Sequence, residues 1–197
     1  MHITQHRMVT DGRLLARLWE LYEQTMASAA IEDASLEMLY WHEFDQYLRD
    51  GRHRLWVLHN DVQPVAMCLV DVDYSAANHL SPAYFERCFP DHAERSAVHS
   101  LCWLVAHPMY ETHGAVVRLG RAVLEMAMAE RALVLFNEPF ESSSSVAGLS
   151  EMMNELARLV GSPAISQKIE VQRYFAIDFA QSAIEADRLS QPVSTSR

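Results

Sequence analysis

The stretch from Ala97 to Asn137 places the strongest constraint on the fold of this chain. An apolar run over residues 97–106 leads into a loop that begins near Pro108. An amphipathic segment over residues 115–131 and a second apolar run over residues 132–136 follow. A short apolar run bounded by a proline fits a strand, and the middle segment has helical spacing. The pattern therefore predicts strand, loop, helix, strand, with any function placed at the loop.

Apolar spacing elsewhere predicts the remaining elements. Positions that recur every three or four residues indicate helices, and apolar runs between turn residues indicate strands. The predicted helices cover residues 13–27, 35–49, 83–89 and 146–160, and the predicted strands cover residues 2–9, 54–59, 64–73 and 168–179. The strands on either side of residues 60–63 form an antiparallel hairpin. The segment from Tyr74 to Arg95 breaks the pattern, with Pro90 closing its short helix, and is predicted to be an insertion.

These elements predict an α/β (α+β) fold in which a mixed central sheet is flanked by helices. The insertion falls between the third and fourth strands. With 197 residues, the chain is long enough for one domain with a sizeable core. We expect residues 1–180 to form that domain. Residues 181–197, which lose all periodicity after Leu189, are expected to form a flexible tail.

Composition excludes several classes of function. Sixteen basic and 26 acidic residues give a formal net charge of −10, which argues against a nucleic-acid partner. No apolar run is long enough to span a membrane, and the first residues lack a signal-peptide core. Cys68, Cys88 and Cys102 lack the spacing of a zinc or redox motif, so we expect buried thiols in a cytoplasmic protein. The histidines and carboxylates match no known metal motif, so no metal is expected.

The order of the elements, together with one motif, resembles the GNAT (N-acetyltransferase) superfamily. In that superfamily the central strand ends as apolar-x-Val-x-Pro, and a loop with a basic residue or Gln and two small residues follows. Here Leu104-Val105-Ala106-His107-Pro108 is similar to the strand end, and Gly114 falls on the first glycine. The resemblance covers roughly residues 3–180 in element order, and its motif lies within about 98–137.

This resemblance implies an acyltransferase that moves an acyl group from a pantetheine thioester to a small-molecule amine. The thioester would be acetyl-CoA, another acyl-CoA or an acylated acyl carrier protein. The segment from Tyr74 to Arg95 is similar in place to one in the superfamily members that make acyl-homoserine lactones or N-acyl amino acids. Those members take their acyl groups from a carrier protein, which makes such a protein a possible partner here.

The resemblance also implies where the donor would bind. Backbone N–H groups near a bulge in the central strand would serve the thioester carbonyl and the pantetheine, and the N-terminus of the next helix would hold the pyrophosphate. The implied binding residues are Leu104, Ala106, Thr112, His113, Gly114 and Ala115. Two positions depart from the pattern: Glu111 stands where Gln or Arg is expected, and Val116 where Gly or Ala is expected. A carboxylate in this loop would repel a pyrophosphate.

Three residues are candidates for acid–base chemistry. His99 lies on the central strand near where the superfamily often places an acidic base, and an imidazole titrates near neutral pH. Glu138 follows the next strand, where it would be the alternative base. Tyr174 on the predicted last strand is a candidate acid for the leaving thiolate. Each has an ordinary alternative: a packed core histidine, a solvated loop carboxylate and a half-exposed strand tyrosine.

Two rival hypotheses remain at this stage. A catalytically inactive domain of the same fold could serve as a binding or sensor module. An unrelated α/β domain could contain a similar strand, loop and helix by coincidence. A pair of parallel central strands that diverge would distinguish the superfamily fold from the unrelated domain.

Overall fold

The computed structural model describes residues 1–32, 38–74, 80–111, 114–137, 149–161 and 169. The chain divides into two compact units, Met1–Gln167 and Lys168–Arg197. Only Ile169 is described in the second unit, so the architecture below is that of the first. The predicted strand over residues 168–179 and the predicted domain boundary at residue 180 lie outside the described residues, Ile169 apart.

A five-stranded mixed sheet forms the centre of the first unit. Its strands occur in chain order: β1 (His2–His6), β2 (His53–Asn60), β3 (Gln63–Asp71), β4 (Val98–Ala106) and β5 (Leu133–Leu135). The first four strands pair antiparallel, whereas β4 and β5 run parallel. Parallel neighbours need a crossover connection, which the chain between residues 107 and 132 provides. The predicted mixed sheet flanked by helices is confirmed.

The hairpin of β2 and β3 follows the sequence prediction closely. Asn60 pairs with Gln63, so the turn consists of Asp61 and Val62, and Asp61 takes the positive φ of 54° that such a tight turn demands. Every residue of β3 from 64 to 71 is buried, because the strand lies in the middle of the sheet with helices on both faces. The apolar run on both faces of this strand is therefore explained.

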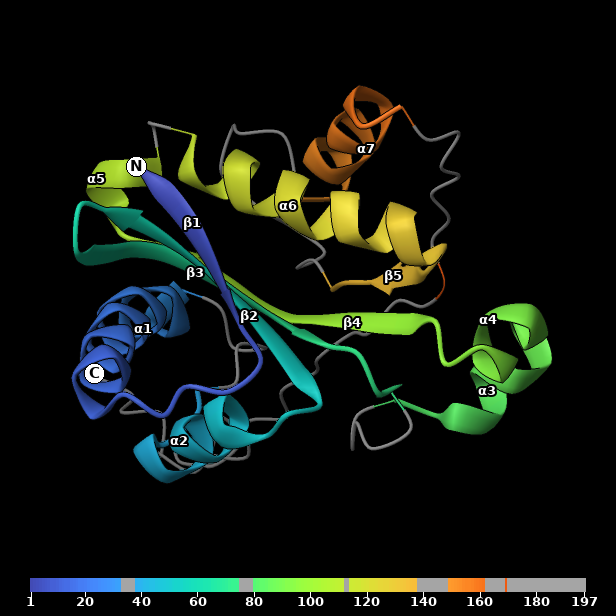
Figure 1. Ribbon diagram of the computed structural model, residues 1–197, viewed down its shortest axis with the longest axis horizontal. Coiled ribbons are helices and arrows are strands. Elements are labelled where there is room, and N and C mark those ends of the chain that lie inside the picture. Colours follow the sequence, from blue (N-terminus) through green and yellow to red (C-terminus); the bar gives the residue numbers. More distant parts are fainter. Residues whose placement is uncertain (33–37, 75–79, 112–113, 138–148, 162–168, 170–197) are drawn as a thin grey trace, which may run out of the picture. The chain divides into compact units, whose positions relative to one another are not determined.

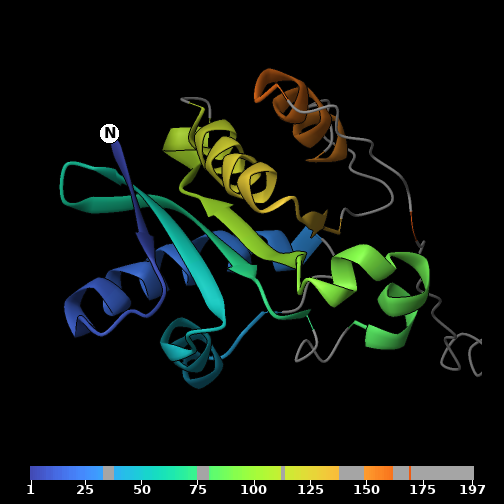
Figure 2. The same ribbon diagram turned by 45° about the vertical axis from the view of Figure 1, so that its right-hand side comes forward.

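Helices cover both faces of the sheet (Figure 1). On one face lie α1 (Gly12–Glu32) and α2 (Trp41–Arg49), and on the other lie α6 (Ala115–Glu130) and α7 (Leu149–Leu159). A single turn, α5 (Pro108–Glu111), joins β4 to the start of α6. Figure 2 shows the same two layers after rotation. Among the described residues, no helix is long and apolar enough to cross a membrane.

Two hydrophobic clusters hold these layers together. Below the sheet, α1 and α2 pack on β2, β3 and β4 through fully buried side chains that include Leu18, Tyr22, Phe44, Val57 and Leu69. Above the sheet, α6 packs on the same strands through side chains that include Leu58, Val70, Leu119 and Val123. The alternation of side chains along each strand sends one set of apolar residues to each cluster.

The insertion between β3 and β4 contains two short helices, α3 (Pro82–Cys88) and α4 (Pro90–Glu94). The helix predicted over residues 83–89 corresponds to α3, which ends at Cys88, before Pro90. The sequence did not predict α4, in which Pro90 occupies the first turn, where its missing N–H costs nothing. Cys88 is exposed near the end of α3, so the expectation that all three thiols are buried was wrong. Cys68 is buried and Cys102 is half-buried.

Two helix boundaries differ from the sequence prediction. Helix α2 begins at Trp41 instead of Ser35, because residues 38–40 have extended or irregular backbone and Glu43 accepts a hydrogen bond from the Tyr40 N–H (2.7 Å). Helix α7 begins at Leu149 in the described chain, and its predicted capping residue, Ser145, lies outside that chain.

Replacing Phe44 by Ala should lower the free energy of unfolding by about 3–5 kcal/mol, because it opens a cavity in the lower cluster. The Phe44 side chain is fully buried, and its ring lies 5.1 Å from that of Tyr22 and 5.3 Å from that of Trp19. Urea unfolding followed by tryptophan fluorescence measures the loss. Leu159→Ala is the control, since Leu159 is 79% exposed and its loss should cost about 0.5 kcal/mol or less. Equal costs for the two variants would contradict this account of the core.

Candidate active site between strands β4 and β5

Strands β4 and β5 pair over a short length and then diverge. Their register joins Val98, His99 and Ser100 with residues 133, 134 and 135, after which β5 ends. Strand β4 continues to Ala106, held along its other edge by β3. Beyond Ser100, the edge of β4 that faces away from β3 therefore has no strand beside it in the described part of the chain. This opening, bounded by β4 from Leu101 to Ala106, is the candidate site.

A β-bulge in β4 lies at the start of the opening. Trp103 pairs with Leu69 and Leu101 pairs with Val70, so Cys102 is the extra residue. Beyond the bulge, the His107 N–H donates to the Val65 carbonyl oxygen of the β3 strand (2.9 Å). Because alternate residues of a strand present their peptide groups to opposite neighbours, the N–H groups of Leu104 and Ala106 face the opening. The two backbone positions that the resemblance implied thus direct their N–H groups away from β3.

The N-terminus of α6 stands at the open end of β4. Gly114 is its N-cap, with a φ of 71°, and no side chain caps the helix. The first helical bond joins the Arg118 N–H to the Gly114 carbonyl oxygen (3.0 Å). The peptide N–H groups of residues 115–117 therefore have no acceptor within the helix, and they carry the positive end of the helix dipole. This end of α6 has the donors that an anion such as a pyrophosphate requires.

Several of the residues predicted to bind the donor, or to disturb its binding, lie around this helix N-terminus. Ala115 is fully buried, and the Val116 side chain packs against the cluster between α6 and the sheet. The valine found where the superfamily pattern has Gly or Ala thus has a packing role. Glu111 ends α5, three residues before Gly114. Thr112 and His113 lie outside the described residues.

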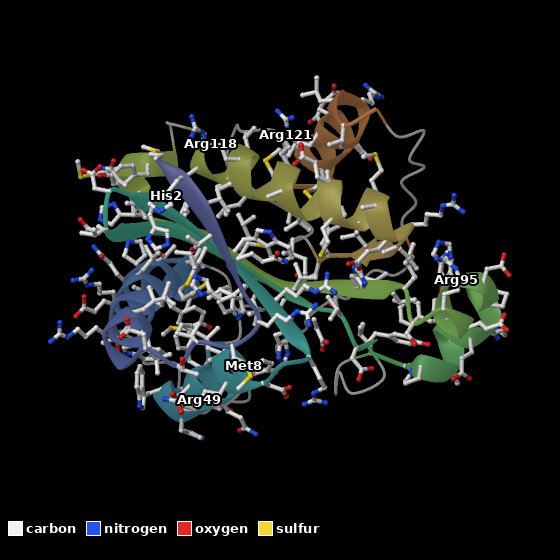
Figure 3. All side chains as sticks on the ribbon, in the orientation of Figure 1. His2, Met8, Arg49, Arg95, Arg118 and Arg121 are labelled. Atoms are coloured by element: carbon white, nitrogen blue, oxygen red, sulfur yellow. The ribbon has the colours of Figure 1, made fainter. Side chains whose placement is uncertain are left out.

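Figure 3 shows Arg118 and Arg121 on the side of α6 that faces away from the sheet. Both are exposed, and the Arg121 side chain donates to Glu125 (2.7 Å). Arg118 lies one residue beyond the three N–H groups at the start of the helix. It adds a positive charge at the end of α6 that has the free donors.

His99 is the one predicted catalytic residue whose surroundings the structure describes. Its side chain lies on the α6 face of β4 and is 2% exposed. The Nε2 atom lies 3.3 Å from an Oε2 atom of Glu130, whereas the Nδ1 atom is buried without a hydrogen-bond partner. Glu130 also accepts a hydrogen bond from Arg54 Nη1 (2.6 Å). Glu138 and Tyr174, the other two predicted catalytic residues, lie outside the described residues.

The electrostatics around His99 favour its neutral form. Burial lowers the pKa of His99, and the charge of Arg54 lowers it further, while Glu130 and Asp71 act in the opposite direction. A neutral imidazole has a free lone pair, which a general base needs. The structure therefore gives His99 the protonation state that the predicted role requires, although a packed histidine would share its burial.

Sequence reasoning missed a second buried polar pair on the other face of the sheet. His53, the first residue of β2, pairs in register with Asp71, the last residue of β3, and His53 Nε2 lies 3.8 Å from Asp71 Oδ2. The Tyr47 ring packs against His53 at 4.9 Å. Only the hairpin register brings these two residues together, although a carboxylate at the end of an apolar strand was a visible signal.

Cys102, at the bulge, is poorly suited to be a nucleophile. Burial, followed by the charge of Asp71, raises the pKa of Cys102 to about 12. A thiol with this pKa holds almost no thiolate at neutral pH, and the thiolate is the reactive form. Cys102 is therefore no activated nucleophile at the edge of this opening.

Known structures have a similar fold. The aminoglycoside acetyltransferase meta-AAC0020 from an uncultured soil metagenomic sample, in complex with trehalose, matches with a TM-score of 0.51 and 12% identity over 90% of this chain and 96% of that one. Its complex with sisomicin gives a TM-score of 0.50 at the same identity and coverage. Aminoglycoside acetyltransferase AAC(6')-Iy, in complex with the bisubstrate analogue CoA-S-monomethyl-acetylneamine, gives 0.50 and 10% identity over 89% and 100% of the two chains. The chain has the GNAT fold.

The GNAT fold excludes the hypothesis of an unrelated α/β domain, and the diverging pair β4 and β5 is the feature that distinguishes the two. No protein-family model and no curated protein sequence matches the chain. At identities of 10–12% the structural neighbours establish the fold, and the chemistry must be argued from this chain's own residues.

Replacing Gly114 by Ala should lower the free energy of unfolding by about 1–2 kcal/mol, because an L side chain is strained at a φ of 71°. Gly12→Ala is a matched control at the start of α1. An added Cβ meets nothing within 4 Å at either of these two glycines, and of the two Gly114 alone has a positive φ. Urea unfolding of both variants measures the difference. If Gly114→Ala does not change the free energy of unfolding, the start of α6 does not depend on this backbone conformation.

Proposed function

We propose that this protein transfers an acyl group from a CoA thioester to a small amine. The observation that carries the proposal is the opening between β4 and β5, which begins beside a bulge and ends at a helix N-terminus. These features supply, in one line along β4, peptide donors for a thioester arm and an anion site for a diphosphate.

The dimensions of the opening suit an extended pantetheine arm. Strand β4 rises roughly 3.3 Å per residue, so the distance from Ala106 to Leu101 is about 17 Å. With the diphosphate on the N–H groups of residues 115–117, the arm would run along β4 toward Ser100. The acyl group would then lie near the bulge, where β4 and β5 begin to pair and where His99 is located.

A cationic amine is the proposed class of acceptor. The formal net charge of −10 attracts cations and repels anionic acceptors. Two of the structural neighbours are aminoglycoside acetyltransferases solved with sisomicin or with an acetylneamine analogue, and aminoglycosides are polycations. The proposed reaction has His99 or Glu138 as the base and Tyr174 as a possible acid for the thiolate.

An acyl carrier protein is the alternative donor. It would use the same opening through its own pantetheine arm, and the segment between β3 and β4 would lie at the side of the site. Helices α3 and α4 of that segment carry the exposed acidic residues Glu86, Asp91 and Glu94. Because carrier proteins are themselves acidic as a rule, this surface favours CoA over a carrier protein.

One observation favours a binding module without catalysis. His99, the described candidate base, is almost fully buried, and an inactive domain would retain the same opening and the same helix N-terminus. Binding of a CoA thioester without release of free thiol in the presence of amines would identify such a module.

Isothermal titration calorimetry with acetyl-CoA, a long-chain acyl-CoA and an acylated carrier protein tests the donor. We expect the CoA thioesters to bind and the carrier protein to bind weakly or not at all. Release of free thiol on addition of sisomicin or spermidine then tests transfer. If none of the three donors binds, the acyltransferase proposal fails. If only the carrier protein binds, the proposed donor is wrong.

Replacing Glu111 by Arg should increase the affinity for acetyl-CoA by roughly three- to tenfold at low salt, because it exchanges repulsion of the diphosphate for attraction. The gain should shrink as salt is added. Glu125→Arg makes the same change of charge roughly 15 Å along α6 from Ala115 and should change the affinity less. Calorimetry at two salt concentrations measures both variants. An unchanged affinity in Glu111→Arg would show that charge at this loop does not limit donor binding.

A further inference from the structure

The contact between Glu130 and the sheet is not explained by helix formation. Glu130 is the last residue of α6, and its carboxylate stands at the negative end of the helix dipole, where an acid is unfavourable. No basic residue occupies the last turn of the helix to offset it. Its charge is balanced from the sheet instead, by Arg54 of β2, and its other carboxylate oxygen lies beside the imidazole of His99 of β4.

The three side chains form a connected series across three elements. Arg54 Nη1 lies 2.6 Å from Glu130 Oε1, and His99 Nε2 lies 3.3 Å from Glu130 Oε2. The Arg54 side chain is 20% exposed and that of Glu130 is 37% exposed, so the series extends from the protein surface to the buried imidazole. Arg95 donates to the backbone carbonyl oxygens of Glu130 and Arg131 and thereby holds the end of α6 in place.

The orientation of His99 leaves one ring nitrogen without a hydrogen-bond partner among the described residues. Nε2 is directed at Glu130, and Nδ1 is buried without a hydrogen-bond partner among the described residues. A buried nitrogen without a partner is costly in a resting protein. His99 also belongs to the three-residue paired segment of β4 and β5, one residue from the point where the strands diverge. Nδ1 therefore belongs to a residue at the closed end of the opening.

We propose that Glu130, itself held by Arg54, is a positioning residue that orients His99 so that Nδ1 accepts a proton from the amine substrate. The inference rests on the proposed acyltransferase function. Glu130 faces the Nε2–H side and fixes the tautomer in which Nδ1 has its lone pair free. Arg54 prevents Glu130 from turning toward solvent.

The proposed reaction is balanced as follows. Nδ1 of His99 takes one proton from the substrate ammonium and later passes it to water. The neutral amine nitrogen attacks the thioester carbonyl carbon, a C–N bond forms, and the C–S bond breaks with its electron pair on sulfur. The nitrogen loses a second proton, which ends on the thiolate. The products are an amide, free CoA thiol and one proton in solution, and no oxidant or metal is required.

The charged groups around His99 set the expected dependence on pH. Glu130 from α6 raises the pKa of His99, Arg54 from β2 lowers it, and Asp71 from β3 raises it, while burial lowers it most. Removing the charge of Glu130 removes one of the two raising interactions and leaves Arg54 unbalanced. The pKa of His99 should therefore fall further in Glu130→Gln.

The test uses three variants of the full chain. His99→Gln should lower kcat by about 10²- to 10⁴-fold and remove the acidic limb of the pH profile of kcat/KM. Glu130→Gln should lower kcat and move that acidic limb to lower pH. Glu125→Gln removes an exposed carboxylate that pairs with Arg121 on the same helix. This variant should leave kcat and the position of the acidic limb unchanged. Thiol release from acetyl-CoA with sisomicin or spermidine is the assay.

Nitrogen-15 NMR of the histidines provides a readout that does not require turnover. We expect His99 to carry its proton on Nε2, and its titration midpoint to fall in Glu130→Gln but not in Glu125→Gln. A proton on Nδ1, or a midpoint that Glu130→Gln does not move, overturns the inference. An acidic limb that Glu130→Gln leaves in place also overturns it, while the proposed function survives. Failure of every CoA thioester to bind the wild-type chain overturns the proposed function and the role of Nδ1 with it.

Discussion

The unequal pairing of strand β4 is the constraint on which the rest of the structure depends. One edge of β4 is held by β3 along almost its whole length, whereas the other edge is held by β5 over only three residues. Peptide groups inside a protein need hydrogen-bond partners, because an unpaired buried donor costs about 1–3 kcal/mol. The opening beyond Ser100 therefore leaves backbone donors that no strand within the described residues satisfies. A bound molecule that accepts hydrogen bonds from these donors would take the place of the missing neighbouring strand.

The surroundings of the opening suit a polar substrate with an anionic end. The donor-rich N-terminus of α6 lies at one end, and the group of Arg54, Glu130 and His99, which extends from the surface to the buried imidazole, lies toward the other. Removing Arg54 would leave the Glu130 carboxylate without its cation at the negative end of the helix dipole. Electrostatics thus fixes the C-terminal end of α6 to the sheet while its N-terminal end stays free of side-chain caps. One helix thereby connects the two ends of the proposed reaction path.

Sequence analysis succeeded where local rules dominate. The hairpin of β2 and β3, the buried character of β3 and the helix over residues 115–130 follow from apolar spacing and turn chemistry. It missed the second helix of the insertion and misjudged one thiol. Pro90 follows the end of α3, as predicted, and also occupies the first turn of α4, which the sequence analysis did not predict. An apolar context suggested a buried thiol at Cys88, but that residue faces solvent on α3.

The sequence by itself determined which segments become strands and helices, because the period of apolar residues is a local property of the chain. The resemblance carried by the residues from Leu104 to Gly114 also led to a prediction of where a pantetheine donor would approach, and this stays a prediction. Only the tertiary structure decided that β5 leaves β4 after Ser100, that the bulge falls at Cys102, and that Arg54, His99 and Glu130 converge. Arg54 and Glu130 are 76 positions apart in the chain, and their meeting depends on strand register and helix packing together. The spacing of apolar residues in a single sequence does not indicate contacts between residues so far apart in the chain.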